Sequence, residues 1–317
     1  MLDVLHSIVP TALFFSAPLI FTALGGVISE RSGVVNIGLE GLMVMGAFVG
    51  IIFNLAFADV FGGWTPWISV LVAVLISGLF SVIHAIASVS LRAEQVVSGV
   101  AINSLALGVG VFLTKELYGK GQTDMVTQPF YTQDIPVLSS IPVIGPLLFE
   151  NIYLTSYLAI ILAFIAWYVL YKTPFGLRLR AVGEHPMAAD TNGINVTKMR
   201  YTAVIISGLL GGLGGSVYAL TIAMNFSHAT IVGQGFMSLA AVIFGKWHPL
   251  GALGAALFFG FAQSLSVVGS SVPVLAGIPP VFLLIAPYAL TILALAGFIG
   301  RAEAPKANGV PYIKGSR

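Results

Sequence analysis

The feature of this sequence that most restricts its fold is a series of long apolar runs separated by short polar connections. A helix that crosses the hydrocarbon core of a bilayer needs about 20 mainly apolar residues, and runs of this kind recur along most of the chain. Only 8% of the 317 residues are charged, whereas soluble domains carry roughly 25%. This is too little charge to solvate a globular surface. The sequence therefore predicts an all-α, polytopic bundle of transmembrane helices.

We predict about nine spans, within a range of about eight to ten. The apolar runs place them at 10–28, 34–57, 66–90, 95–114, 152–171, 201–222, 235–246, 250–268 and 278–298. The seventh run is short, so we expect it to be broken or re-entrant. The longest polar stretches are an outer loop at 115–150, which we expect to hold one short interfacial helix, and an inner loop at 172–200. The transmembrane domain is then 1–300, and a polar tail covers 301–317.

The placement of basic residues orients these spans. Lys and Arg concentrate in the cytoplasmic loops of membrane proteins. With nine spans and the tail inside, all of the 14 basic residues except Lys115 and Lys120 fall on the inner side. This bias predicts an odd number of spans, an outer N-terminus and a cytoplasmic C-terminus. A further re-entrant segment near the N-terminus would reverse the side of that end alone.

A polar, glycine-rich stretch between the first two apolar runs, Ser29–Gly41, reads SERSGVVNIGLEG. Asn36 and Glu40 stand at the head of the second run, and their spacing of four would place them on one helix face. A polar side chain within hydrocarbon is costly unless it faces a cavity or a partner. The glycines give a smooth surface against which other helices pack closely. The stretch therefore predicts a polar path through the bundle.

Other apolar runs also contain polar residues. We predict a substrate pathway lined by Asn36, Glu40, Asn103, Asn225 and Gln263. The alternative is that such residues form interhelical hydrogen bonds that hold the bundle together, and for His84 we prefer that interpretation. Glu40 is open to both interpretations. Glu94, next to Arg92 at a predicted inner boundary, is open to interpretation as an interfacial ion pair.

The inner loop 172–200 contains a second informative pattern. Glu184-His185-Pro186 is typical of a helix start and Gly193 of a helix end. The loop thus predicts a short helix outside the bilayer, flanked by basic residues, which suits docking to a cytosolic protein. Composition alone favours a simpler interpretation, in which the basic loop only fixes the topology.

Several catalytic and metal-binding motifs are missing from the sequence. It has no Gly-x-x-x-x-Gly-Lys-Ser/Thr phosphate loop, so it cannot bind ATP by that device. It has no His-Glu-x-x-His, and its 5 histidines show no metal-ligand spacing. It has no cysteine, which excludes disulfides and thiolate metal sites. We expect no catalytic residue, and no cofactor, metal or nucleic acid bound by this chain.

These motifs resemble those of the permease subunits of nucleoside ABC importers, which belong to a superfamily with ribose and branched-chain amino-acid permeases. The resemblance rests first on Glu30–Gly41, which reads ERSGVVNIGLEG. It extends to 91–98, 183–194 and 243–251, and the tail at 304–315 is similar to that of the shorter permease subunit. It therefore covers nearly the whole chain. One departure is His185, where relatives often carry a small polar residue such as Asn.

The resemblance implies an ATP-driven importer for nucleosides, guanosine and other purine nucleosides included, in the bacterial plasma membrane. Its partners would be a sister permease that completes a heterodimer, a cytosolic ATP-binding subunit that carries ATP and Mg, and an extracellular substrate-binding lipoprotein. The missing phosphate loop agrees with this division of labour. The resemblance also favours docking by the segment 184–193, as the coupling helix that contacts the ATPase. Its candidate residues are Glu184, His185, Pro186, Ala188, Ala189, Asp190 and Gly193.

Three alternatives stand beside this interpretation. A simple-sugar ABC permease would use the same Asn and Gln chemistry that binds ribose. A stand-alone facilitator or ion-coupled carrier would need buried ion-coupling carboxylates beyond Glu40, and the sequence has few. A membrane-embedded transferase or protease would need a catalytic dyad, and none is evident.

Overall fold

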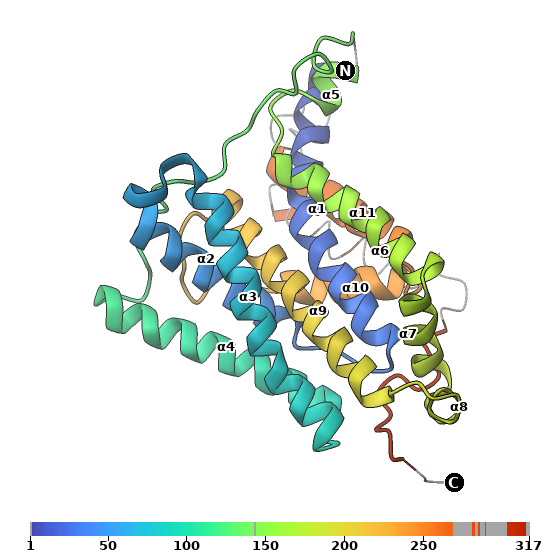
Figure 1. Cartoon of the computed structure of the whole chain (residues 1–317). Helices are drawn as coiled ribbons and strands as arrows, with labels where there is room; N and C mark the ends of the chain where they lie inside the picture. Colours follow the sequence, from blue (N-terminus) through green and yellow to red (C-terminus); the bar gives the residue numbers. More distant parts are fainter. Residues whose placement is uncertain are drawn as a thin grey trace.

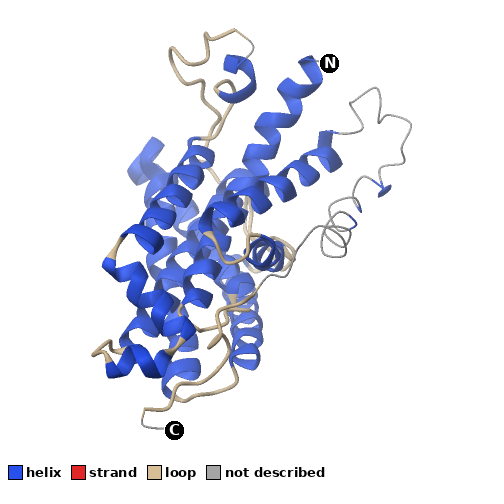
Figure 2. Ribbon diagram, turned by 90° about the vertical axis from the view of Figure 1, so that its right-hand side faces the viewer, coloured by secondary structure: helices blue, strands red, loops and turns tan. Residues whose placement is uncertain are grey.

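The computed structural model describes residues 2–142, 144–268 and 303–314, together with the single positions 281, 282, 285 and 289. Every named element in these residues is a helix, and Figure 2 shows them joined by loops without a strand. The predicted all-α bundle is confirmed.

Long helices form the body of the described structure. They are α1 (Leu2–Arg31), α2 (Leu39–Phe61), α3 (Thr65–Ala85), α4 (Gln95–Tyr118), α6 (Leu154–Lys172), α9 (Val196–Tyr218) and α11 (Pro249–Val268). The shorter α-helices are α5 (Ile144–Leu148), α7 (Pro174–Glu184), α8 (Pro186–Thr191) and α10 (Gln234–Phe244). A 3-10 turn at Gly62–Trp64 joins α2 to α3, and π-helical turns at Ile86–Ser90 and Ala219–Ala223 extend α3 and α9.

Six stretches of the described residues are long and apolar enough to cross a membrane, and one of them, Leu39–Ser90, contains both α2 and α3. Each predicted span from 10–28 to 250–268 overlaps a helix. The predicted short run at 235–246 corresponds to α10, which has only 11 residues. The predicted span at 278–298 lies outside the described residues apart from four single positions, so the count of nine stays a prediction.

The helix ends gather at two opposite ends of the bundle (Figure 1). The N-terminus and α5 lie at one end, and α7, α8 and the C-terminus lie at the other. We call these the α5 end and the α8 end. At the α8 end, a terminal nitrogen of Arg31 lies 3.9 Å from a carboxylate oxygen of Glu184. Which of these two ends faces the cytoplasm stays a prediction.

The predicted outer loop is an ordered, irregular segment at the α5 end. The N–H of Thr123 donates to the carbonyl of Phe226, and the N–H of Val126 donates to the carbonyl of Met224, at 2.9 and 2.8 Å. The expected short helix is present as α5. The loop therefore packs over the segment that follows α9.

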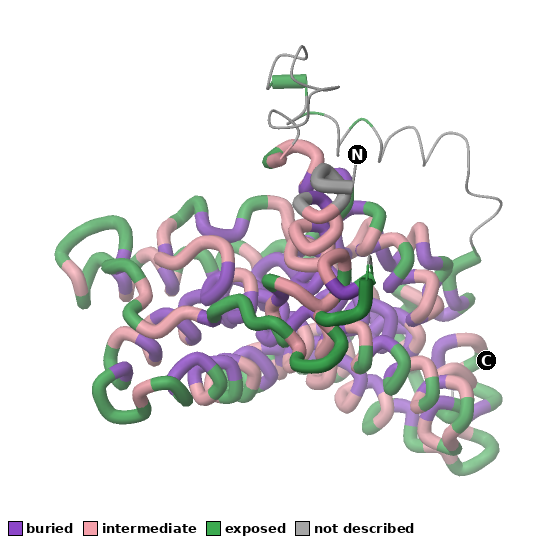
Figure 3. Tube along the Cα trace, turned by 90° about the horizontal axis from the view of Figure 1, so that it is seen from above, coloured by how far each residue is buried: buried purple, intermediate pink, exposed green. Residues whose placement is uncertain are grey.

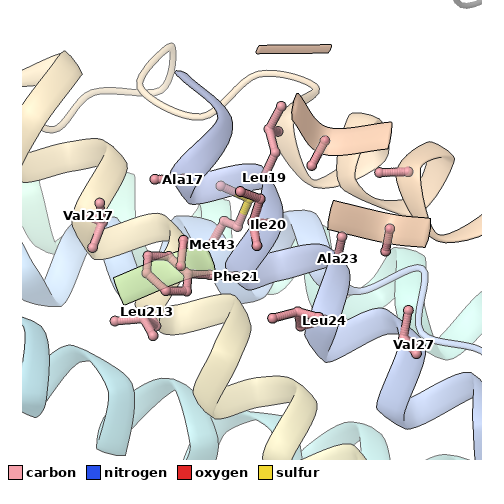
Figure 4. Close-up of a cluster of buried hydrophobic side chains, with 14 of the residues drawn as sticks. Ala17, Leu19, Ile20, Phe21, Ala23, Leu24, Val27, Met43, Leu213 and Val217 are labelled. Carbon is pink, nitrogen blue, oxygen red and sulfur yellow. The ribbon is translucent and has the colours of Figure 1, made fainter. Parts of the chain in front are cut away.

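Helix α1 is central to the bundle, packing against α6, α9, α10 and α11. Figure 4 shows Leu19, Phe21 and Leu24 of α1 together with Met43 of α2 and Leu213 of α9 in one apolar cluster. Buried positions run through the middle of the bundle when it is viewed along its length (Figure 3). Much of the apolar surface of α3 and α4 is exposed, as lipid-facing or partner-facing helices require.

Glycines let α2 and α9 approach closely. A Cβ atom on Gly46 would lie 2.3 Å from the carbonyl oxygen of Gly212, and a Cβ on Gly215 would lie 2.0 Å from that of Met43. Both distances are too short for any side chain, so even alanine would push the two helices apart. For Gly46, this confirms the predicted role of glycines as a smooth packing surface.

Candidate functional site

Residues 32–38, which we call the α1–α2 link, connect the end of α1 at Arg31 to α2 through turns and irregular backbone. Gly33 has a φ of +89°, a left-handed conformation that glycine adopts without a steric penalty. Helix α2 begins only at Leu39. The predicted helical start at residue 34 is therefore wrong, and Asn36 and Glu40 do not share a helix face. The physical reason is that side chains of other helices bind the backbone of the link.

Two side chains of α4 supply most of these hydrogen bonds. The side-chain oxygen of Gln95 accepts from the N–H of Val35 at 2.7 Å. Asn103 donates to the carbonyl of Ile37 at 3.1 Å and accepts from the N–H of Gly41 at 2.7 Å. Buried backbone groups need partners, and these two side chains replace the helical partners that the link lacks. Asn103 thus uses both ends of its amide to hold the start of α2.

His84 of α3 binds the link from another side. One ring nitrogen lies 2.9 Å from the hydroxyl of Ser98, and the other lies 3.1 Å from the carbonyl of Val35. The side chain is buried. The structural interpretation of His84 is confirmed.

Asn36 is the polar side chain of the link that binds α9. It is fully buried, and its amide nitrogen donates to the hydroxyl of Ser207 at 2.8 Å. Ser207 lies near the middle of α9, so the link enters the interior of the bundle before α2 begins. The side-chain oxygen of Asn36 has no hydrogen-bond partner among the described residues. The side-chain oxygen of Asn36 is therefore a buried hydrogen-bond acceptor that no described residue uses.

Glu40 joins the start of α2 to the start of α10. Its two carboxylate oxygens accept from the N–H groups of Gly233 and Gly235, at 2.5 and 2.6 Å. These N–H groups lie at the positive end of the α10 dipole, where a carboxylate is stabilising. A Cβ on Gly235 would lie 2.4 Å from the backbone of Glu40, so only glycine permits this approach. The structure thus favours the role of Glu40 as a contact between helices.

The other two predicted pathway residues lie away from the link. The carbonyl of Asn225 accepts from the hydroxyl of Thr230 at 3.1 Å, within the segment between α9 and α10. The amide nitrogen of Gln263, on α11, lies 3.6 Å from the sulfur of Met237 on α10. The structure therefore brings the first three predicted residues to the link and leaves these two outside it.

Sequence reasoning missed three partners of Asn36 and Glu40: Ser207, Gly233 and Gly235. The two glycines flank the start of the short run that became α10. Interrupted apolar segments with such glycines often mark the centre of a transporter, and this pattern was the available signal. Ser207 carries no comparable signal, because serine is common in apolar helices.

Glu94 caps a helix and forms no ion pair with Arg92 in the part of the chain that the structure describes. Its carboxylate accepts from the N–H groups of Val96 and Val97, at 3.0 and 2.7 Å. These are unpaired donors of the first turn of α4, which an acidic N-cap residue satisfies. The interpretation as an interfacial ion pair is therefore wrong.

Helix α8 forms where the sequence predicts a short helix. His185 is its N-cap residue, Pro186 occupies its first turn, and Gly193 follows its end with a φ of +81°. The preceding α7, in contrast, was not predicted as a separate helix. The start and end signals of the segment 184–193 are confirmed.

The candidate docking residues divide between two faces of this segment. Ala189 is buried in an apolar cluster with Val182 of α7 and Val196 of α9. The side chains of Met187 and Ala188 are exposed. One face of α8 therefore packs on the chain, and the other is open to a partner.

Two acidic candidates hold the segment to its surroundings. Glu184 pairs with Arg31 at 3.9 Å, and Asp190 pairs with Lys314 at 3.8 Å. His185 is exposed beside them, and Pro186 is partly buried. The segment thus has an ion pair near each end, and the exposed side chains of Met187 and Ala188 lie between them.

Comparison with known proteins identifies the family. The family model described as the permease component of a branched-chain amino acid transport system matches residues 8–295. The chain belongs to this permease family. The permease is 65% identical to the guanosine ABC transporter permease protein NupQ of Bacillus subtilis, over 99% of each chain. It is 54% identical to the nucleoside ABC transporter permease protein NupC of Lactococcus lactis, over 98% of each chain.

A third relative is more distant. The nucleoside ABC transporter permease protein NupB of Lactococcus lactis is 27% identical over 92% of this permease and 80% of its own length. The resemblance seen in the motifs is thus confirmed at the level of the family. The permease is a transport component and a multi-pass membrane protein.

Proposed function

We propose that this permease is one of two unlike membrane subunits of an ATP-driven importer for nucleosides. The observation that carries the proposal is its identity of 65% and 54%, over nearly the whole chain, to permeases named for guanosine and for nucleosides. Two permeases of Lactococcus lactis carry the nucleoside name, and this chain is 54% identical to one and 27% to the other. This pattern supports a heterodimer in which this chain pairs with a sister permease.

In this proposal, ATP and Mg bind a separate cytosolic subunit, and an extracellular lipoprotein delivers the nucleoside. The α8 end, including the C-terminus, faces the cytoplasm of a bacterial cell. The basic residues of that end support this orientation; they are Arg178, Arg180, Lys198 and Lys314. The ATPase then contacts the exposed face of α8.

The interrupted starts of α2 and α10 give this subunit its part in transport. Both helices begin inside the bundle and meet at Glu40, and discontinuous helices of this kind form substrate sites in many transporters. ATP on the partner shifts the permease between outward-open and inward-open states only if it favours one of them. We assign substrate contact first to Asn36, because its unpaired side-chain oxygen lies in the link that leads into α2, whereas the unpaired oxygen of Gln263 lies on α11. Contacts by Asn225 and Gln263 stay predictions.

The test is uptake of labelled guanosine by proteoliposomes that contain this permease, its sister permease, the ATPase and the lipoprotein. We expect ATP-dependent uptake of labelled guanosine that unlabelled nucleosides inhibit and free ribose does not inhibit. Competition by ribose or glucose, with none by nucleosides, would establish the simple-sugar alternative. Uptake by this chain alone, without ATP, would establish a stand-alone carrier.

A further inference from the structure

The C-terminal segment 303–314, which we call the tail segment, lies along the α8 end and contacts several separate parts of the permease. The N–H of Ala307 donates to the carbonyl of Gly183, at the end of α7, at 2.9 Å. The N–H of Gly309 donates to the carbonyl of Gly33, in the α1–α2 link, at 3.3 Å. Ala307 is itself buried. The tail segment thus bridges the docking segment and the link through its backbone.

A buried carboxylate adds a further attachment. The side chain of Asn308 donates to Glu30, at the end of α1, at 3.1 Å. The same oxygen of Glu30 accepts from the indole N–H of Trp247, in the turn between α10 and α11. Glu30 is only 3% exposed. One acidic side chain therefore connects the tail segment to α1 and to the far end of α10.

Arg200, near the start of α9, is hydrogen-bonded to the tail segment. Its side chain is 1% exposed, and one terminal nitrogen donates to the carbonyl of Val310 at 2.9 Å. A Cβ on Gly33 would lie 2.8 Å from the other terminal nitrogen and 3.0 Å from the carbonyl oxygen of Ala307. The link, the guanidinium and the tail segment are thus in direct contact. The Val310 carbonyl binds one of the three guanidinium nitrogens, whereas the other two have no hydrogen-bond partner among the described residues. Because unbound buried donors are costly, the bond to Val310 is the hydrogen bond that ties Arg200 to the tail segment.

The tail segment also contacts α8 itself. Lys314 pairs with Asp190 at 3.8 Å. Tyr312 packs against the apolar cluster that contains Ala189. The buried face of the docking helix therefore rests partly on the tail segment.

We propose that the tail segment is a strap that transmits movement of α8 to the α1–α2 link, with Arg200 as the positioning residue that holds it. This inference rests on the proposed function, because α8 moves only if an ATPase docks there. A segment bound at once to α8, to the end of α7 and to Gly33 carries the movement to the residues beside Asn36.

The test compares ATP consumed with nucleoside transported in the complete complex. In a double variant, Asn308→Ala with Tyr312→Ala, the strap loses its contacts to Glu30 and to the α8 cluster. We expect the number of ATP molecules hydrolysed per nucleoside transported to rise about tenfold. Loss of one buried hydrogen bond changes an equilibrium constant by about this factor. The matched control is Val310→Ala, because that side chain is exposed and its carbonyl is retained. Arg200→Met should raise the ratio in the same way.

A merely structural role would lower uptake and ATP hydrolysis in proportion to the amount of complex and leave their ratio unchanged. That result for an assembled double variant would overturn the strap. If the unmodified complex takes up no nucleoside, the proposed function is contradicted instead. The two failures are therefore distinguishable.

A second experiment applies if the double variant does not assemble. The chain has no cysteine, so Asp190→Cys with Lys314→Cys introduces the single pair that a short thiol cross-linker can join. If the strap moves with α8, cross-linked complexes should keep their ratio of ATP to nucleoside. Blocked uptake, restored by a cleavable linker, would mean that the tail segment slides along α8 and would contradict the proposal.

Discussion

The α1–α2 link and helix α8 are both short polar segments, but they use their polar residues in opposite ways. Around the link, Asn103 of α4 and Glu40 of α2 use their hydrogen bonds on backbone groups of this chain. In α8, His185 and Met187 are exposed, and only the buried face packs on the chain. A polar residue in a membrane bundle therefore points to a ligand only after its hydrogen bonds within the chain have been counted. By that measure, Asn36 stands apart from its two neighbours.

This contrast predicts two kinds of variant. Changes to the side chains that bind the backbone in and around the link should affect the amount of folded permease, because these backbone groups need a partner when buried. Changes on the outer face of α8 should leave the fold intact and affect only the contact with the ATPase.

The largest effect is expected for Glu40→Ala. The variant leaves the N–H groups of Gly233 and Gly235 buried without their carboxylate, and each such loss costs roughly 1–3 kcal/mol. We expect membrane abundance to fall at least about tenfold, with uptake falling in proportion, as measured by quantitative immunoblot and transport. The control is Glu116→Ala, which removes an exposed carboxylate from α4. Normal abundance of Glu40→Ala with lost uptake would instead place Glu40 on the substrate pathway.

The next effect is expected for Asn36→Ala. If the unpaired side-chain oxygen contacts substrate, its removal should slow uptake about tenfold at normal abundance, because a lost buried hydrogen bond costs about 1.4 kcal/mol. The matched control is Ser207→Ala, which breaks the same internal hydrogen bond but keeps the Asn36 side chain. Equal losses of abundance and uptake in both variants would show that Asn36 is structural.

These two residues also show what the sequence could and could not predict. Helix positions were predictable because a span is a local property of about 20 residues. The start and end of α8 were predictable for the same reason, since His185, Pro186 and Gly193 act on their immediate neighbours. The conformation of the link was not, because its hydrogen bonds join residues 60 and 171 positions apart.

Glu40 gives the clearest case of this limit. Its partners at the start of α10 lie 193 and 195 positions along the chain. A single sequence reports that a carboxylate in an apolar run must be paired or used, but it does not report which. The placement of α10 favours the first of these interpretations, in which the carboxylate is paired.

A smaller effect is expected on the buried face of α8. In Ala189→Trp, the side chain has no room in the cluster with Val182 and Val196, so α8 should tilt away from its support. We expect abundance to stay near normal, because α8 lies outside the described spans, while uptake falls about fivefold through about 1 kcal/mol of lost docking. The measurement is nucleoside-stimulated ATPase activity beside uptake. Unchanged ATPase activity and unchanged uptake would show that the segment 184–193 does not couple ATP hydrolysis to transport.

The smallest effect is expected on the exposed face, for Met187→Ser. Met187 is 40% exposed and belongs to a helix whose fold rests on Ala189, so the thermal stability of the isolated permease should not change. Most interface residues cost less than about 1 kcal/mol when truncated, so affinity for the ATPase should fall about fivefold or less. Titration of the ATPase against reconstituted permease measures this change. The comparison variant is Ala189→Ser, which changes the buried face of α8. If both variants lose the same thermal stability, the two faces of α8 do not differ, and the contrast between α8 and the link is wrong.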